Sequence, residues 1–191
     1  DAVDRAGGGE FETVHVLVNN AGVYCTRRQL TVDGIERTLA VNHLAPVLLT
    51  LGLEELLRQS APARVVNVGS GAYRRGRIEL EDPNQERRYR PFAAYANSKL
   101  ALLLAGLQQA ARLEGSGVSV NCLHPGLAAT EIFRDLPPAG RFLLRAVSPS
   151  PERAARRSVF LAASHKVEGV TGRFFIGERP EPHPAPADDG E

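Results

Sequence analysis

Short apolar runs alternate with longer amphipathic segments along most of the chain. Runs rich in Val, Ile, Leu and Phe predict strands, and helical spacing of apolar residues predicts helices. The expected strands lie at 14–22, 63–71, 118–126 and 172–176, and the expected helices at 31–59, 92–114 and 150–164. Strands that are apolar almost throughout are typical of a parallel sheet with helices on both faces. The pattern therefore indicates a doubly wound α/β fold with about four strands.

Local signals indicate where the expected helices begin and bend. Thr31 is the expected N-cap of the first helix, and Pro46 inside that helix predicts a kink or a division. Ser150 is the expected N-cap of the last helix, with Pro151 at its first position and Glu152 in its first turn.

Three of the expected strands end in small or polar residues. The segments NNAG, GSG and HPG close the runs at 14–22, 63–71 and 118–126. Ligands of open parallel sheets bind outside the carboxyl ends of the strands. We therefore expect the functional site at these three strand ends.

Composition and charge exclude several classes of protein. A formal net charge of +1 gives no electrostatic reason to expect nucleic acid or an anionic membrane surface as a partner. No apolar run reaches the roughly 18 residues of a membrane span, and no signal-peptide pattern opens the chain. Two cysteines, Cys25 and Cys122, do not form a disulfide framework pattern. We expect a cytoplasmic protein without a membrane span in this chain.

The segment YANSK contains a tyrosine and a lysine four residues apart. Tyr95 and Lys99 then lie on one face of the expected helix, one turn apart. An ammonium near a phenol favours the phenolate, so Lys99 is expected to lower the pKa of Tyr95 from about 10. Such a tyrosine suits general acid–base catalysis on a carbonyl/alcohol pair. Ser70, at a strand end, could bond the same substrate oxygen. A surface tyrosine, a surface lysine and a turn serine are the alternative interpretation.

Five segments decide between these interpretations. NNAG, VNHL, NVGSGA, YANSK and HPGLAATE occur in the order and spacing of the short-chain dehydrogenase/reductase superfamily. The chain resembles in particular the retinol-dehydrogenase-like branch of that superfamily, over roughly residues 12–177. The resemblance implies the C-terminal part of a Rossmann-type domain at 1–178. The Pro-rich, acidic residues 179–191 are expected to form a disordered tail.

The resemblance also implies roles for four residues. Tyr95 matches the proton donor to the substrate carbonyl in reduction and the acceptor in oxidation. Lys99 matches the residue that lowers the pKa of that tyrosine and bonds the nicotinamide ribose. Ser70 matches the serine that polarises the carbonyl, and Asn42 matches the asparagine whose backbone holds a water of the proton relay.

A nicotinamide dinucleotide is the cofactor that the resemblance implies, NADP or NAD, with NADP favoured. The matching cofactor-binding positions, in addition to Tyr95 and Lys99, are Asn19, Ala21 and Gly22 on the adenosine side and Pro125, Gly126 and Thr130 on the nicotinamide side. Hydride transfer belongs to the cofactor, while the protein supplies position and protons. The implied substrate is a small apolar carbonyl compound or alcohol.

Two departures from the family pattern bear on this expectation. The charged segment 73–91 separates Ser70 from Tyr95, and we expect it to be an exposed loop near the mouth of the site. The Thr-Gly-x-x-x-Gly-x-Gly phosphate loop of the family does not occur, and the chain contains no methionine. We therefore expect an N-terminal part to be missing, and the chain alone to be inactive, poorly soluble and unable to bind NAD(H) or NADP(H).

Alternatives remain for both assembly and activity. Helix 92–114 is apolar around most of its circumference, which favours a homodimer through this helix. A nucleotide-sugar epimerase or dehydratase of the same superfamily would share the Tyr–Lys pair, although NNAG and the short C-terminal region argue against it. A truncated, non-catalytic interaction module is the other alternative.

Overall fold

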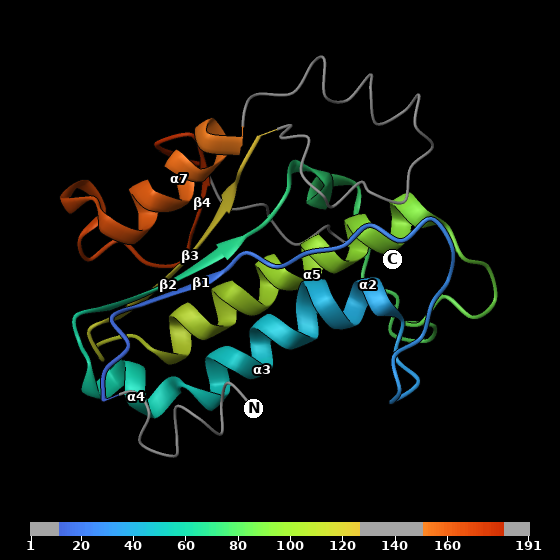
Figure 1. Ribbon diagram of the computed structural model, residues 1–191, viewed down its shortest axis with the longest axis horizontal. Coiled ribbons are helices and arrows are strands. Elements are labelled where there is room, and N and C mark those ends of the chain that lie inside the picture. Colours follow the sequence, from blue (N-terminus) through green and yellow to red (C-terminus); the bar gives the residue numbers. More distant parts are fainter. Residues whose placement is uncertain (1–11, 127–150, 182–191) are drawn as a thin grey trace, which may run out of the picture.

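A five-stranded sheet forms the centre of the computed structural model, which describes residues 12–126 and 151–181 (Figure 1). The strands lie in the order of the chain, and all neighbours are parallel except the last pair. They are β1 (Val16–Asn19), β2 (Ala63–Val68), β3 (Val118–His124), β4 (Arg173–Ile176) and β5 (Arg179–Glu181). The first four confirm the strands that the apolar runs predict, with shorter bounds.

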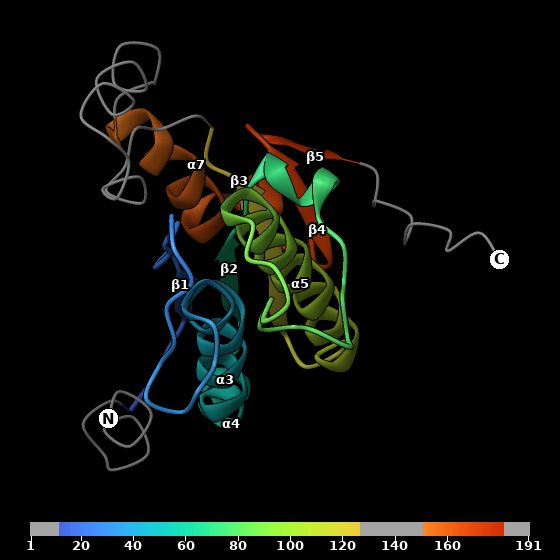
Figure 2. The ribbon, with the colours of Figure 1, turned by 90° about the vertical axis from the view of Figure 1, so that its right-hand side faces the viewer.

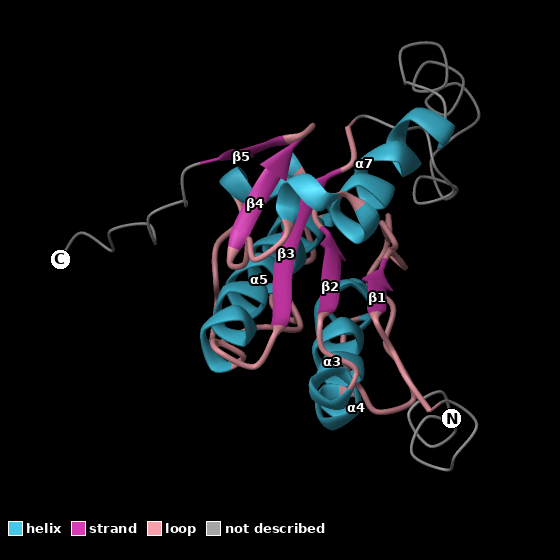
Figure 3. Cartoon of the chain, turned by 90° about the vertical axis from the view of Figure 1, so that its left-hand side faces the viewer, coloured by secondary structure: helices cyan, strands magenta, loops and turns pink. Residues whose placement is uncertain are grey.

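Helices cover both faces of the sheet, as expected for a doubly wound fold (Figures 2 and 3). Helix α5 (Pro91–Arg112) and the helices before it lie on one face, and α7 (Pro151–Ala163) lies on the other. Alternate residues of the central strands point to the two faces. Val65 packs with Leu57 and Leu113 in one core cluster, while Val66 packs with Leu161 in the second.

The first helical segment begins later than the sequence predicts. It consists of α2 (Arg37–Leu39), a π-helical turn η1 (Ala40–Leu44), α3 (Ala45–Gly52) and α4 (Glu54–Gln59). The expectation that Thr31 caps it is wrong, because the Thr31 hydroxyl accepts from the backbone N–H of Ile35 inside a turn. Glu36 is the N-cap, and its carboxylate accepts from the N–H of Leu39 at 2.8 Å.

Pro46 does divide this segment, through the π-helical turn before it. In a regular α-helix the carbonyl of Asn42 would accept from the N–H of residue 46, which proline lacks. The helix forms a wider π-helical turn here, in which the N–H of Ala45 donates to the carbonyl of Ala40, five residues earlier. Asn42 therefore lies in an irregular turn that packs against α5.

The C-terminal region differs from the sequence expectation in one element. Residues 179–181, expected to begin a disordered tail, form β5 and pair antiparallel with β4. An ion pair of 2.8 Å between Arg74 and Glu181 also holds this strand to the residues after β2. The rest of the expected tail and the expected N-cap Ser150 lie outside the described residues. Pro151 does begin α7, and Glu152 lies in its first turn.

Strand β1 lies at one edge of the sheet and has one strand neighbour among the described residues. Its Val16 and Val18 side chains are 42% and 39% exposed. An uncovered apolar edge favours association with another strand. Among the described residues, no helix combines the length and apolar character that crossing a membrane requires.

Candidate active site

Ser70 lies immediately beyond the carboxyl end of β2, where the register of the sheet brings three strand ends together. Asn19 of β1 is level with Asn67 of β2, and Asn67 is level with Cys122 of β3. Ser70 caps the short 3₁₀ helix η2 (Gly71–Arg75), and its hydroxyl accepts from the N–H of Ala72 at 3.2 Å. The small residues that end β2 therefore present a hydroxyl at the edge where ligands of parallel sheets bind.

Tyr95 and Lys99 lie on one face of α5, as their spacing predicts. Tyr95 is 8% exposed, and its phenol lies next to the Ser70 side chain. Lys99 is 3% exposed, and its ammonium donates to the carbonyl of Val68 at 2.9 Å. The Lys99 Nζ lies 5.9 Å from the centroid of the Tyr95 ring. The fold thus brings the three candidate catalytic side chains together at the end of β2.

The pKa of Tyr95 does not shift in the expected direction in the protein by itself. Burial raises the pKa of Tyr95 above its ordinary value, and the hydrogen bond with Ser70 lowers it by less. Burial also lowers the pKa of Lys99, to about 8. Desolvation disfavours the charged form of each group, so it acts against the phenolate and the ammonium alike. The sequence shows the pairing of the two residues but not how deeply both are buried.

Asn42 joins three parts of the site. It is fully buried, and its amide both accepts from the N–H of Val23, at 2.8 Å, and donates to the carbonyl of Val23, at 2.9 Å. It also donates to the hydroxyl of Ser98, between Tyr95 and Lys99 on α5, at 3.0 Å. The side chain therefore ties the loop after β1 to the catalytic helix. Ser98 was missed by sequence reasoning, although it lies inside the YANSK segment.

The expected cofactor positions lie around the same strand ends. Asn19 is buried and donates to Asn67, at 2.8 Å, and to Thr50, at 3.2 Å, so its side chain links β1 to β2 and α3. Ala21 is exposed and Gly22 half-buried in the loop that follows. Thr50 and Asn67 were missed by sequence reasoning, because isolated polar residues inside apolar segments carry no motif.

On the nicotinamide side, Pro125 and Gly126 follow β3 and are half-buried. Gly126 has φ +94°, and a Cβ there would lie 2.9 Å from the guanidinium of Arg157. The positive φ therefore favours glycine at this position, whereas the flexible end of the Arg157 side chain could move aside. Thr130, the last expected contact, lies outside the described residues.

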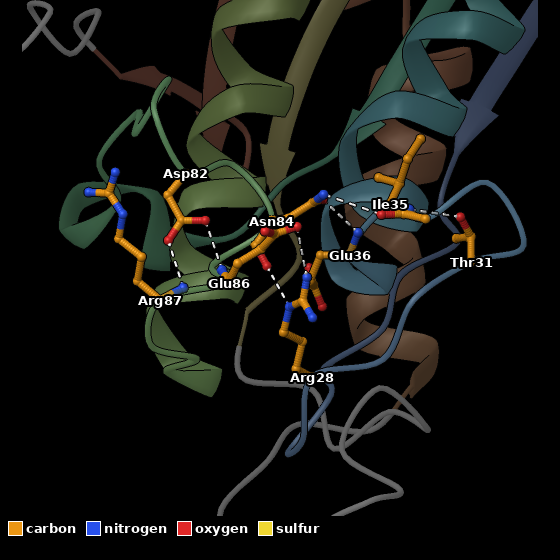
Figure 4. A network of polar contacts seen from close by, with 9 residues as sticks. Arg28, Thr31, Ile35, Glu36, Asp82, Asn84, Glu86 and Arg87 are labelled. Carbon is orange, nitrogen blue, oxygen red and sulfur yellow. Dashed lines mark hydrogen bonds and ion pairs between the residues drawn. The ribbon is translucent and has the colours of Figure 1, made fainter.

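The segment 73–91 is bound to the protein more firmly than an exposed loop would be. Asn84 lies between two neighbours (Figure 4): its backbone carbonyl accepts from Arg28, and its side-chain oxygen accepts from the N–H of Glu36, both at 2.9 Å. Tyr89 donates to the carbonyl of Cys25 at 2.9 Å. Residues 77–81 are exposed as expected, but the second half of the segment is bonded to residues 25–36. These partners are distant in sequence, so no local pattern indicates them.

Gly76 provides a test of how this segment packs on α5. We expect Gly76→Ala to lower the free energy of unfolding by about 1–3 kcal/mol, the usual cost of overpacking. The added Cβ would lie 2.5 Å from the carbonyl oxygen of Ala96 and 2.8 Å from the Cβ of Leu100. Urea unfolding measures the change, with the exposed neighbour substitution Arg75→Ala as the control. An unchanged midpoint for Gly76→Ala would contradict this packing.

Comparisons with known proteins agree with this arrangement. A family model described as short chain dehydrogenase matches residues 2–139, more than half of the chain. Retinol dehydrogenase 13 of Homo sapiens is 41% identical over 191 residues, covering 95% of this chain and 57% of that protein. Retinol dehydrogenase 14 of Mus musculus is 45% identical over 172 residues, covering 87% of this chain and 52% of that protein. The chain thus spans about half the length of these curated relatives.

Solved structures show the same fold. The crystal structure of a short chain dehydrogenase from Burkholderia cenocepacia in complex with NADP superposes with a TM-score of 0.65 at 25% identity, covering 91% of this chain and 67% of that chain. The parallel sheet and these similarities agree with one another. The chain belongs to the short-chain dehydrogenase family, in its retinol-dehydrogenase-like branch.

Proposed function

We propose that the protein containing this chain transfers hydride between a nicotinamide dinucleotide and a carbonyl or alcohol group of a small apolar substrate. The observation that carries the proposal is the convergence of Ser70, Tyr95 and Lys99 at the carboxyl end of β2. The named activities of the relatives and the NADP held by the solved relative support it. All-trans-retinal is accordingly the first substrate to test.

The three side chains have distinct roles in this proposal. Tyr95 gives its phenolic proton to the carbonyl oxygen in reduction and takes a proton back in oxidation. Ser70, which lies next to Tyr95, donates to the same oxygen and stabilises its developing charge. Lys99 holds its ammonium beneath the Tyr95 ring, where it favours the phenolate that proton transfer leaves behind.

The residues fit a nicotinamide dinucleotide on the nicotinamide side. The Lys99 ammonium has three N–H donors, and the described residues accept one of them, at the Val68 carbonyl. The remaining donors suit the hydroxyls of a ribose. When bound, the cofactor supplies the hydride. Lys99, Tyr95, Pro125 and Gly126 would hold its nicotinamide half, and the loop containing Ala21 and Gly22 its adenosine side.

Three further parts of the sequence interpretation stay predictions. We predict that NADP is preferred to NAD, that the protein is cytoplasmic, and that α5 takes part in a homodimer. Much of the apolar circumference of α5 packs against α2, η1 and α3 of its own chain. The surface left for a partner includes Leu104 of α5, which is 36% exposed, and Leu48 of α3, which is 65% exposed.

Ser70 gives a direct test of the proposed function. We expect Ser70→Ala to lower kcat for retinal reduction by about 10²-fold or more, the effect of losing one oxyanion donor. Cofactor affinity should barely change, because Ser70 contacts Tyr95 and its own turn. Steady-state oxidation of NADPH measures the rate, with Ser119→Ala, a half-buried serine at the opposite end of β3, as the control.

An unaltered kcat in Ser70→Ala would show that Ser70 is only a turn residue and has no part in catalysis. A protein that binds neither NADPH nor NADH, and turns over no carbonyl compound with either, would contradict the function itself. That result would favour the non-catalytic interaction module.

A further inference from the structure

The last two residues of β3 hold the residues on either side of Ser70. The backbone N–H of Gly69 donates to the carbonyl of Leu123 at 2.8 Å. The N–H of Gly71 donates to the Nδ1 of His124 at 3.2 Å. Ser70 is thus placed between two hydrogen bonds to β3, one of them to a titratable side chain.

The bond to Gly71 defines the protonation of His124. An imidazole nitrogen that accepts an N–H carries no proton, so Nδ1 is bare and the proton of the neutral ring is on Nε2. A proton added to Nδ1 would point at the Gly71 N–H and replace attraction with repulsion. The bond therefore exists only while His124 is neutral.

The surroundings of His124 keep it neutral near pH 7. Burial lowers its pKa below the ordinary value, and the positive charges of Arg157 and Arg74 lower it further. Arg157 approaches from α7 and donates to the His124 carbonyl at 3.1 Å. Arg74 approaches from η2 and is itself paired with Glu181 of β5. Among the described residues, the charges that act on His124 are thus those of Arg157 from α7 and Arg74 from η2, and Glu181 of β5 is paired with Arg74.

We propose that His124 is a positioning residue that holds the Ser70 hydroxyl against Tyr95 through its hydrogen bond to the Gly71 N–H. The inference rests on the proposed function, because it gives the Ser70 turn a catalytic consequence. A displacement of about 1 Å at a reacting group can cost about 10²-fold in rate. Losing the Gly71 bond should therefore lower kcat without changing the groups that would bind the cofactor.

The test compares two substitutions at His124 with a control. His124→Asn offers an amide oxygen where Nδ1 lies and does not titrate, whereas His124→Phe keeps a ring but has no acceptor. The control is His165→Phe, because His165 is an exposed histidine that bonds only to Glu168 among the described residues. Each protein is assayed for kcat with retinal from pH 5 to 8 and for the NADPH dissociation constant.

We expect His124→Phe to lower kcat about 10- to 10²-fold at pH 7 with an unchanged NADPH dissociation constant. His124→Asn should recover most of this loss. In the parent, kcat should fall as the pH decreases and His124 becomes protonated. His124→Asn should not show this fall, because its side chain does not titrate. A kcat in His124→Phe equal to that of the parent, or the same acid limb in His124→Asn and the parent, would overturn the proposal.

A second measurement is independent of catalysis. In nuclear magnetic resonance spectra of the parent, the amide signal of Gly71 should shift as His124 titrates. At pH values above the pKa of His124, this amide should be protected from hydrogen exchange. A Gly71 amide that does not respond would overturn the proposal even if the enzyme is active. A Gly71 amide that responds in a protein without turnover would support the contact and place the failure in the proposed function.

Discussion

Tyr95→Phe is expected to abolish measurable turnover, with a loss of kcat of about 10³-fold or more, while the protein still binds its cofactor. The expected loss lies within the range of about 10²–10⁴ for general acid–base catalysis. Tyr95 is buried beside Ser70, and phenylalanine fills the same volume without the proton. The substitution therefore removes one chemical group and leaves the packing of α5 unchanged.

Single-turnover kinetics and NADPH titration of the Tyr95→Phe protein separate these two effects. The matched control is Tyr89→Phe, which removes a hydroxyl that donates to the carbonyl of Cys25 and to the carboxylate of Glu36. It should cost stability, about 1–2 kcal/mol for the lost hydrogen bonding, and leave kcat nearly unchanged. Equal rates for Tyr95→Phe and the parent would mean that Tyr95 is not the proton donor.

Lys99→Arg has the second largest expected effect, although it keeps the positive charge. Lys99 is 3% exposed, and burial already lowers its pKa to about 8. Arginine cannot lose its proton in this way, and its planar guanidinium is larger than the ammonium that it would replace. We expect the variant to lose stability and to bind the cofactor at least about 10-fold more weakly, since the donor to the ribose is displaced.

The pH–rate profile of Lys99→Arg carries a separate expectation. Its apparent pKa should rise above that of the parent, because the compact ammonium beneath the ring, which favours the phenolate, is lost. Lys99→Met serves as the second variant if Lys99→Arg does not fold, since methionine is apolar and adaptable. Parental cofactor affinity and an unchanged profile in a folded variant would show that Lys99 has no part in the mechanism.

The sequence predicts the sheet and the grouping of the three candidate side chains, because both depend on local patterns. Val65 and Val66, which face opposite helix layers, lie in an apolar run that indicates a strand covered on both faces. The spacing of Tyr95 and Lys99 places them on one helical face without reference to any other part of the chain. Strand ends and helix faces therefore suffice to bring Ser70, Tyr95 and Lys99 together.

Features that depend on distant partners were not predictable in this way. The helix begins at Glu36 rather than at Thr31, because Leu30 and Glu36 form a bridge and Asn84 binds the Glu36 N–H. Strand β5 is three residues long and is held by β4 and by the pairing of Glu181 with Arg74. Such contacts leave no periodic signal in the sequence.

The direction in which the pKa of Tyr95 shifts was also not predictable from local patterns. It depends on the desolvation of Tyr95 by the whole fold, which exceeds the effect of its hydrogen bond with Ser70. Sequence spacing shows which groups are neighbours, but the balance between burial and attraction requires the packed structure.

Transfer of deuterium from the cofactor to the substrate tests the central claim most directly. NADPH, and in parallel NADH, labelled with deuterium at C4 of the nicotinamide is incubated with retinal and the protein, and the alcohol is analysed by mass spectrometry. We predict deuterium on the carbinol carbon with the parent protein, and none with a Tyr95→Phe protein that still binds the cofactor. A parent protein that binds either cofactor and retinal yet forms no deuterated alcohol, or a Tyr95→Phe protein that forms it at the parental rate, would contradict the account.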